Sequence, residues 1–343
     1  MMHQEIFVQD RKPASPSFYL ETGSTDPTYN LAFEEFVLRN RREGDYLILW
    51  QNHNSVIIGR NQNALEEINR EFVDAHGVQV VRRNTGGGAV YHDLGNLNYS
   101  FITDAMEGDT QSGNRFTATV VKALRALGLD AESSGRNDIL VNGKKVSGTA
   151  QHRIGSRILH HGTLLFDSNG DMISGSLNPD PTKFQSKSIK SVRSRVGNIR
   201  SMLSEDLSLP AFWAHLKGAL SQEGAIYACL SCEELAAVEA LRAAKYTTWQ
   251  WNYGSSPKFD SKIRRRLSGG LLEIHLTVKH GRIESLAIYG DFLALQPIDP
   301  LILLLTDVAY REDQIYCALS DFPLADYLGS ITLEEFVDTL LNR

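Results

Sequence analysis

The stretch RRNTGGGAVYHDLGNLNYSF, residues Arg82 to Phe101, places two arginines and three consecutive glycines just ahead of a histidine and an aspartate. Ordered glycine costs more backbone entropy than any other residue, so the run indicates that the chain needs bare backbone there. Successive N–H groups without side chains form concavities that bind anions, phosphate above all. Taken alone, three glycines favour a tight hairpin between two strands. The stretch fits neither the G-x-G-x-x-G nor the G-x-x-x-x-G-K-[ST] nucleotide motif.

The composition is that of an ordinary soluble protein, and 343 residues suffice for a large core and two domains. A formal net charge of −6 argues against a general nucleic-acid binder, which usually carries a basic excess. With only 3 cysteines no disulfide framework is expected, which fits a cytoplasmic protein. Residues 1–12 are polar and the longest apolar run, 301–305, is too short to span a bilayer, so we expect no membrane association.

Strand and helix patterns alternate through the first 250 residues, which predicts an α/β fold. Asn63, followed by Glu66, predicts the capped start of a helix that ends at Gly77. The Asn142-Gly143 pair predicts the turn of a β-hairpin.

Between residues 249 and 257 aromatic residues give way to Gly, Ser and Pro, which is typical of a linker. A shorter α/β pattern follows, with strands 271–278 and 282–288 joined at His280-Gly281. We therefore expect a catalytic domain over 1–250, a linker over 251–258 and an accessory domain over 259–343.

Further short motifs flank the glycine stretch in a definite order. They are WQN (50–52), GRNQN (59–63), GRNDI (135–139), GKKVSG (143–148), HHGTL (160–164) and KSVRSR (190–195). In this order and spacing, from the first motif to the linker, the chain closely resembles the lipoate–protein ligases.

The resemblance implies a class II aminoacyl-tRNA synthetase and biotin ligase-like α/β domain with a small α/β C-terminal domain. It also implies the reaction. ATP and lipoate or octanoate give an acyl-adenylate and pyrophosphate, and a lysine of an acceptor domain then attacks, releasing AMP. The acceptors implied are E2 subunits of 2-oxoacid dehydrogenases or the glycine-cleavage H protein. The preferred acyl chain and acceptor stay open.

Lys145 is the residue that the resemblance makes catalytic, because the matching lysine lies between the acyl carbonyl and the α-phosphate. A compact ammonium suits a bridge between two oxygens. Spacing alone favours a surface lysine after an Asn-Gly turn, and the family match reverses that reading.

The resemblance distributes the other site residues between two ligands. For ATP they are Arg83, Gly88, Ala89, Val90, Tyr91, Lys145 and His161, and for lipoate Arg83, Gly87, His92 and Lys145. Arg83 would grip phosphate, and the loop would offer backbone donors. His92 fits a hydrogen-bonded structural histidine at least as well as an acyl contact, and His161 could simply pack on a strand.

Asp138 could hold the Mg²⁺ that bridges ATP phosphates, or it could form an Asx turn or strand cap. Residues 183–200 carry six basic residues (Lys183, Lys187, Lys190, Arg193, Arg195 and Arg200) and no acid. We interpret this segment as a lid over the adenylate that could also steer an acidic acceptor, against the alternative of a solvated loop.

Two alternative functions remain at this point. A lipoyl or octanoyl transferase on the same fold would need no ATP but would need a nucleophilic cysteine in the site, and none lies within 82–163. A non-catalytic lipoyl-adenylate sensor would be expected to lose Lys145 or the glycines, and both are present. The lone C-x-x-C pair, Cys229 and Cys232, fits small buried or capping residues better than a redox site.

Overall fold

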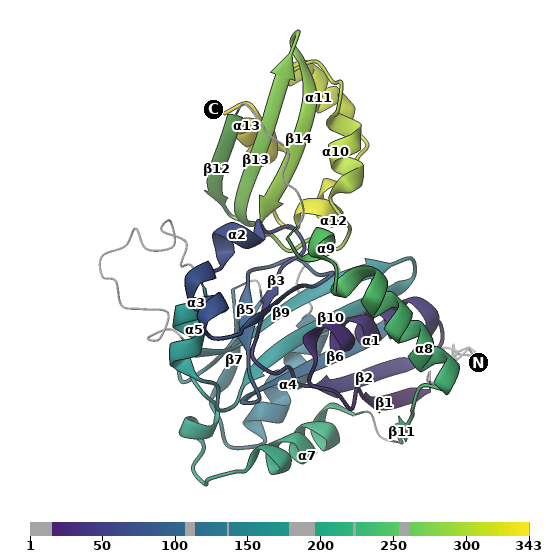
Figure 1. Cartoon of the computed structure of the whole chain (residues 1–343), viewed down its shortest axis with the longest axis vertical. Coiled ribbons are helices and arrows are strands. Elements are labelled where there is room, and N and C mark those ends of the chain that lie inside the picture. The colour runs from purple at the N-terminus through teal and green to yellow at the C-terminus, as the bar shows by residue number, and fades with distance from the viewer. Residues whose placement is uncertain are drawn as a thin grey trace, which may run out of the picture.

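A computed structural model describes residues 16–106, 114–135, 137–177, 196–221, 224–253 and 261–342. An eight-stranded mixed sheet forms the centre of the larger part, residues 16–253 (Figure 1). In spatial order its strands are β11 (Ile226–Tyr227), β1 (Ser17–Glu21), β2 (Asp45–Trp50), β6 (Asn96–Asp104), β10 (Arg157–Leu165), β9 (Lys144–Ile154), β8 (Asp138–Val141) and β7 (Ala131–Ser134). The predicted α/β class is confirmed.

The two faces of this sheet are covered by different helices. Helices α4 (Asn114–Arg125) and α7 (Leu209–Leu220) pack on one face around Tyr99 and Phe101. Helices α1 (Pro27–Asn40) and α8 (Cys232–Leu241) cover the other face. Because side chains alternate along a strand, Ser100 of β6 points to the α1 face, where its hydroxyl donates to Glu34.

A second, three-stranded sheet packs on the α1 face, in the order β4 (Gln79–Arg82), β3 (Ser55–Ile58), β5 (Val90–His92). Strand β4 is parallel to β3, and β5 is antiparallel to it. The glycines between β4 and β5 therefore cross the end of β3. The hairpin alternative for the glycine run is wrong, since the two strands that flank it both pair with β3 and not with each other.

The helix predicted over 63–77 is broken into α2 (Ala64–Glu67) and α3 (Arg70–Ala75). Ile68 is extended and bridges to Leu177, just after α5 (Gly170–Ser176). The Asn63 side chain makes no capping hydrogen bond, and Asn69 instead accepts from the Phe72 amide. The predicted start after Asn63 and the predicted end at Gly77 are thus confirmed, whereas the helix is not continuous and lacks the expected side-chain cap, because a tertiary strand contact interrupts it.

The Asn142-Gly143 hairpin is confirmed between β8 and β9. Both residues have positive φ, 52° and 73°, as a two-residue hairpin turn requires. The pairing register shifts between Ile139 and Leu140, so that Leu140 lies opposite Lys145. This turn and this shift set the position of Lys145.

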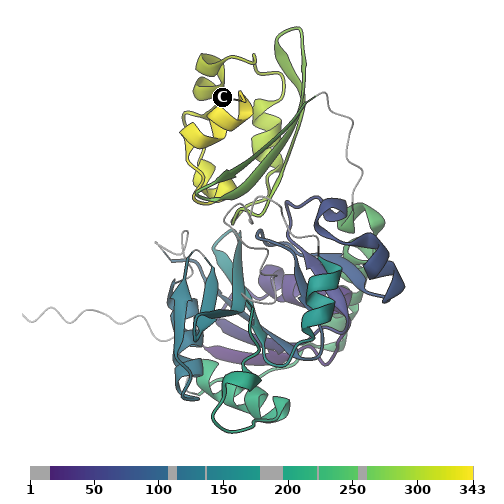
Figure 2. The same cartoon turned by 90° about the vertical axis from the view of Figure 1, so that its left-hand side faces the viewer.

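Residues 261–342 form a smaller α/β part with a sheet in the order β12 (Ser261–Leu267), β13 (Gly270–Lys279), β14 (Arg282–Gly290). Helices α10 (Asp299–Leu305), α11 (Glu312–Leu319), α12 (Leu324–Leu328) and α13 (Leu333–Leu340) pack on one face of it (Figures 1 and 2). The predicted turn at His280-Gly281 is confirmed, with φ of 50° and 74°. Strand β12 and helix α12 were not expected from the sequence.

The polypeptide between the two parts starts in an ordered way. Residues Arg242–Tyr246 form a π-helical turn, and Trp249–Asn252 form helix α9, capped by Thr248. The first two residues of the predicted linker therefore belong to a helix, and 254–260 lie outside the described residues. The proposed domain boundaries remain a prediction.

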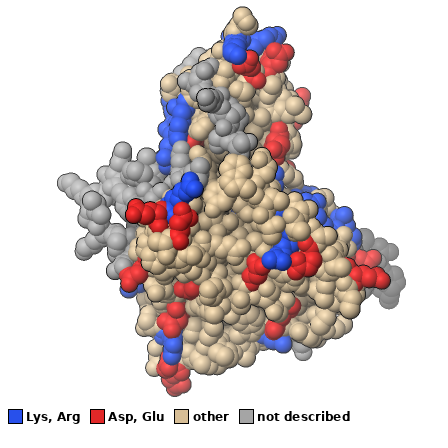
Figure 3. Space-filling model, in the orientation of Figure 1, with Lys and Arg blue, Asp and Glu red and all other residues tan. Residues whose placement is uncertain are grey.

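The surface carries charges of both signs, with a band of Lys and Arg along the edge formed by β12 (Figure 3). There Lys262, Arg264 and Arg266 alternate along the strand, and ion pairs join them to Glu273 and Asp291. No helix in the described part of the chain has the length and apolar character to cross a membrane.

Candidate active site

Lys145 begins the candidate site, at the start of β9. Its Nζ lies 2.7 Å from Oδ1 of Asp138 on the neighbouring strand β8, and both side chains are about one-third exposed. The two atoms are close enough for an ion pair, but their geometry is not that of a hydrogen bond. Gly148 lies beside the lysine, because a Cβ there would come 3.4 Å from Nζ. The ammonium is thus held on the α1 face of the sheet, next to bare backbone.

Arg83 is buried inside the glycine loop, residues 83–89. Its guanidinium donates to the carbonyl oxygens of Ile57, Gly86 and Gly88 at 2.6–3.0 Å. Its Nε donates to Oγ1 of Thr85 at 2.8 Å. Burial lowers the pKa of Arg83 to about 10, which leaves it charged at neutral pH. In this structure Arg83 shapes the loop from within, and its contact with phosphate remains a prediction.

A chain of polar side chains links the loop to α1. His161 Nε2 lies 2.8 Å from Thr85 Oγ1, and its Nδ1 lies 2.9 Å from a carboxylate oxygen of Glu34. Glu34 also accepts from Ser100, which in turn accepts from the Trp50 indole at 2.9 Å. His161 therefore lies beside the glycine loop with protein side chains as its closest contacts, and its contact with ATP remains a prediction.

Glu34 and Thr85 lie in the candidate site, and neither was among the site residues predicted from the sequence. Glu34 is 127 residues from His161, so no local pattern links the two. One signal was available: Glu34 and Glu35 interrupt the apolar run Leu31–Leu38, and both are buried. Buried carboxylates require partners, which identifies α1 as a site-facing helix.

His92 is buried at the end of β5, where its Nδ1 lies 3.0 Å from the Asn52 amide nitrogen. Burial lowers the pKa of His92 to about 3, and the Arg83 and His161 charges add to the effect. The imidazole is therefore neutral at physiological pH. The ring of Trp50 stands edge-on to it, with centroids 6.4 Å apart.

The remaining loop residues fall on different sides. Val90 packs with the core that includes Ile57 and Val81, on the α1 side. Tyr91 packs in the cluster around α2 and α3, and its hydroxyl donates to Asn54. The Tyr91 side chain is thus engaged in that cluster, so the ATP contact that we predicted for Tyr91 can come only from its backbone.

A second polar cluster ties the segment after α8 to the glycine loop. Lys245 Nζ lies 2.7 Å from both Glu35 Oε2 and Asn84 Oδ1. The hydroxyl of Tyr246 donates to the same carboxylate at 2.7 Å. Burial alone would raise the pKa of Glu35, but Lys245 and the hydrogen bonds outweigh it and lower it to about 2. These residues stabilise Asn84, just before the glycines.

Arg82, at the end of β4, joins two segments of the chain through its guanidinium, and we call this set of contacts the Arg82 clamp. Its guanidinium donates to carbonyl oxygens of residues 59, 60 and 62 and of residues 251 and 252, at 2.6–3.0 Å. Two segments that lie far apart in the sequence are thus joined through one side chain. The clamp fixes the start of the connection to the smaller part.

The smaller part docks directly on the glycine loop. The amide of Gly87 donates to the Phe292 carbonyl at 3.2 Å, and a Cβ at Gly86 would come within 2.5 Å of that same oxygen. Leu295 accepts from the Arg153 amide at 3.0 Å and lies 2.9 Å from Nδ1 of His152. Bare backbone at Gly86 is therefore required by this contact.

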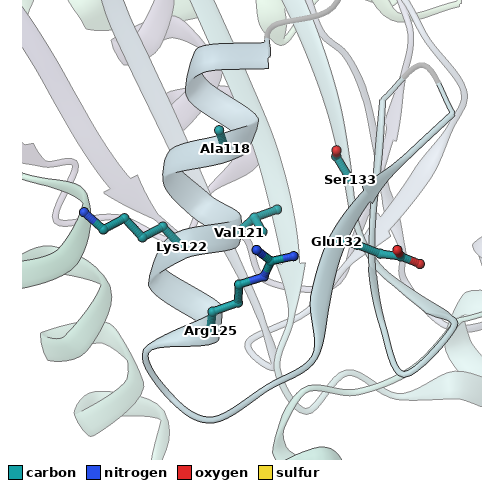
Figure 4. A pocket seen from close by; sticks show the side chains of 6 residues that line it. All are labelled: Ala118, Val121, Lys122, Arg125, Glu132 and Ser133. Atoms are coloured by element: carbon teal, nitrogen blue, oxygen red, sulfur yellow. The ribbon is translucent and has the colours of Figure 1, made fainter.

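A separate surface pocket of about 330 Å³ lies between α4 and β7 (Figure 4). It is lined by Ala118, Val121, Lys122, Arg125, Glu132 and Ser133. None of these is a predicted site residue, and they lie on the sheet edge and the face opposite α1. The pocket therefore adds nothing to the candidate site.

Two predictions from the sequence, the magnesium ligand and the lid over the adenylate, can be compared with the structure. Within the described residues no group of three or more His, Cys, Asp or Glu side chains could hold a metal ion. Asp138 is present as a single carboxylate beside Lys145. Of the predicted lid, residues 183–200, the part from 183 to 195 lies outside the described residues, and Arg200 at its end pairs with Asp167 and Asp206.

Comparison with known families identifies the family to which the chain belongs. Residues 26–221 match the model of the lipoyl protein ligase A/B catalytic domain, and residues 256–340 match that of the bacterial lipoate protein ligase C-terminus. The chain belongs to the lipoate–protein ligase family. It is 40% identical over 322 residues to lipoate–protein ligase 1 of Staphylococcus aureus, covering 93% of this chain and 98% of that protein. It is 41% identical over 320 residues to lipoate-protein ligase LplJ of Bacillus subtilis, covering 92% and 97%.

Solved lipoate ligase structures share the fold. The Plasmodium falciparum enzyme LipL1, in complex with lipoate, superposes with a TM-score of 0.78 at 27% identity and covers 95% of this chain and 99% of that one. A bipartite Thermoplasma acidophilum ligase, described with its E2 lipoyl domain, gives 0.61 at 32% identity over 72% and 99%. A lipoate–protein ligase A bound with ATP gives 0.59 at 30% identity over 70% and 99%. This lipoate–protein ligase is therefore an enzyme with the expected mixed α/β fold.

Proposed function

We propose that this ligase uses ATP to convert lipoate to lipoyl-adenylate and then transfers the lipoyl group to a lysine of an acceptor domain. The observation that carries the proposal is the position of Lys145, whose ammonium lies on the α1 face beside Gly148. A related ligase of the same fold was solved with ATP and another with lipoate, which supports both substrates.

Adenylation brings two anions together, because a carboxylate oxygen attacks the α-phosphorus while pyrophosphate leaves. An ammonium that bridges the two groups neutralises the charge that develops in the transition state. Lys145 is suited to this bridge, since its Nζ has three donors and Asp138 as its one ion-pair partner among the described residues. The bare backbone of the glycine loop lets the adenylate lie close to β5.

Asp138 is the residue that would hold Mg²⁺. Magnesium is commonly bound by one or two carboxylates, with the substrate's phosphates and water completing its ligands, so a single carboxylate at this place fits. When bound, the ion would neutralise charge on the departing pyrophosphate. The same carboxylate orients Lys145 in this structure, so Asp138 serves the lysine whether or not it also holds the ion.

In the second half-reaction the acceptor's lysine amine attacks the acyl carbonyl, an amide forms and AMP leaves with the electrons of the broken anhydride bond. The archaeal relative described with its E2 lipoyl domain supports acceptors of this kind. We extend the proposal to E2 lipoyl domains and the glycine-cleavage H protein. A transferase mechanism is disfavoured, because Cys229, Cys232 and Cys317 are exposed and lie on none of the site's elements.

The deciding experiment is exchange of labelled pyrophosphate into ATP by the full chain, with Mg²⁺ and without acceptor protein. Lipoate-dependent exchange is the expected result. No exchange, together with lipoyl transfer from an acylated carrier protein, would replace this proposal with the transferase alternative. Addition of an E2 lipoyl domain or of H protein in separate reactions, with mass measurement of the acceptor, then tests the partner.

A further inference from the structure

A chain of hydrogen bonds beneath the glycine loop determines which ring nitrogen of His92 carries the proton. It starts at Asn30, whose amide nitrogen lies 3.1 Å from the Ser24 carbonyl and 2.7 Å from the Gln51 carbonyl. Backbone carbonyls only accept, so this atom must be the donor nitrogen. It also lies 2.9 Å from Asn52 Oδ1, which therefore accepts.

The orientation of the Asn52 side chain then determines which ring nitrogen of His92 is protonated. With its oxygen turned to Asn30, Asn52 presents its amide nitrogen to His92 Nδ1 at 3.0 Å. The imidazole is neutral, because burial lowers the pKa of His92 to about 3. Nδ1 accepts, so the proton sits on Nε2. That N–H is buried and has no hydrogen-bond partner among the described residues.

Asn98 brings a second buried polar group to the same place. Its Oδ1 accepts from Asn96 at 3.0 Å, while its amide nitrogen has no partner within the described part of the chain. If the side-chain amides of Asn96 and Asn98 were both rotated so that O and N change places, one polar atom of Asn98 would still lack a partner. Asn98 lies opposite Trp50 in the β2–β6 pairing, and Trp50 stands edge-on to His92. Trp50 is therefore a neighbour of both residues, through strand pairing with Asn98 and through its ring with His92.

A row of cross-strand neighbours connects this place with Lys145. Asn98 lies opposite Thr163, whose hydroxyl accepts from the Gly148 amide at 3.2 Å. Gly148 is the residue beside the Lys145 ammonium. Strands lie about 4.8 Å apart, so Asn98 is roughly 10 Å from Gly148 across two spacings. An extended eight-carbon acid, with bonds of about 1.5 Å, spans about 9 Å.

We propose that His92 and Asn98 form the polar far end of the acyl site and select an acid whose distal end can accept a hydrogen bond. This deepens the proposed function, on which it rests. The cyclic disulfide of lipoate offers sulfur atoms that are weak acceptors, whereas the methyl end of octanoate offers none. An alkyl end would leave the buried N–H groups unpaired, and a site built to hydrogen-bond its ligand discriminates strongly against a ligand that lacks the partner.

The test is calorimetric binding of lipoate and of octanoate to the full chain without ATP, which is independent of any turnover. We expect lipoate to bind roughly tenfold more tightly than octanoate. His92→Phe should bring the ratio of the two dissociation constants close to one, mainly by weakening lipoate. Asn98→Leu is a second variant, for use if loss of the Asn52 partner makes the first one unfold.

His160→Phe is the matched control. His160 is equally buried, its pKa is also lowered to about 3 by burial, and neither ring nitrogen has a partner among the described residues. It stacks on Phe116, on the opposite face of the sheet. The control should keep the wild-type ratio of dissociation constants.

Equal affinity of the unchanged protein for both acids would overturn the inference, as would a ratio that His92→Phe and Asn98→Leu leave unchanged. Failure to bind either acid would overturn the acyl site itself. Pyrophosphate exchange measured in parallel separates these results from failure of the proposed function. If both acids support exchange with equal efficiency, the ligase function stands and only the proposed selectivity for lipoate is overturned.

Discussion

The Nζ atom of Lys145 lies 2.7 Å from Oδ1 of Asp138, across the hairpin that Asn142-Gly143 closes. This pairing points the ammonium along the α1 face of the sheet. Lys145→Ala should reduce lipoate-dependent pyrophosphate exchange roughly 10²–10³-fold, because it removes a charge directed at the transition state. The circular dichroism spectrum and melting temperature should stay near wild type.

The neighbouring lysine supplies the control for this prediction. Lys144 is exposed on the adjacent position of β9, and Lys144→Ala should leave exchange within about twofold, as for a surface change away from a site. Near-normal exchange in Lys145→Ala would contradict the role that we assign to this residue.

Asp138→Asn separates the two roles of the carboxylate. Loss of a magnesium ligand should raise the Mg²⁺ concentration needed for half-maximal exchange, by roughly tenfold. Loss of orientation of Lys145 alone would lower the maximal rate at any Mg²⁺ concentration. The measurement is a Mg²⁺ titration of exchange at saturating ATP, and an unchanged titration midpoint would remove Asp138 as a magnesium ligand.

Gly86→Ala should weaken docking of residues 261–342 on the glycine loop. The new Cβ would meet the Phe292 carbonyl at 2.5 Å and the Ala294 amide at 2.9 Å, both of them backbone atoms. We expect a larger radius of gyration in small-angle scattering. Gly88→Ala is the control for docking, since its Cβ would meet nothing within 4 Å. Equal scattering by the two variants would show that the contact at Gly86 does not hold the parts together.

Arg82→Lys should destabilise the larger part by roughly 2–3 kcal/mol. Arginine reaches five carbonyl oxygens in two segments, and a lysine has only three donors and no planar fork. Denaturant unfolding measures the change in the free energy of unfolding. Arg125→Lys, at a position where the guanidinium donates to the Ala131 carbonyl, should change the free energy of unfolding by less than about 0.5 kcal/mol. A similar loss in both variants would argue against the clamp.

The protein should lose stability when the pH falls from 6.5 to 5. Burial lowers the folded-state pKa of His92 and His160 to about 3 and of His152 to about 4, below the usual 6.5. In this pH range the unfolded chain binds the protons, so the stabilisation is full above pH 6.5 and is lost as the pH falls towards the folded pKa values. Each histidine accounts for up to about 1.4 kcal/mol per pH unit.

His160→Phe tests this pH dependence. Denaturant unfolding at pH 7.5 and at pH 5.0 should show a loss of free energy about 2 kcal/mol smaller in the variant than in the wild type. Glu35, with a pKa of about 2, does not interfere, because its own contribution is lost only below its unfolded value of about 4.5. An identical loss in both proteins would show that His160 is not held neutral.

Local signals in the sequence predicted local structure well where the residues themselves impose a conformation. Asn142-Gly143 and His280-Gly281 both turn at positive φ, as expected. A helix does begin after Asn63, but it is not continuous to Gly77, because Ile68 pairs with Leu177 and interrupts it. A contact between residues so far apart leaves no mark in a local pattern.

The sequence by itself determined the alternating α/β pattern, the hairpin that carries Lys145 and, through the order of its motifs, the family. Only the tertiary structure decided that the glycines cross the end of β3, that Arg83 turns inward to the loop's own carbonyls, and that His161 meets Glu34. Turns and caps depend on the backbone preferences of a few adjacent residues, which the sequence states directly. Buried polar partners are selected by which strands and helices meet, and that is decided by the packing of the whole chain.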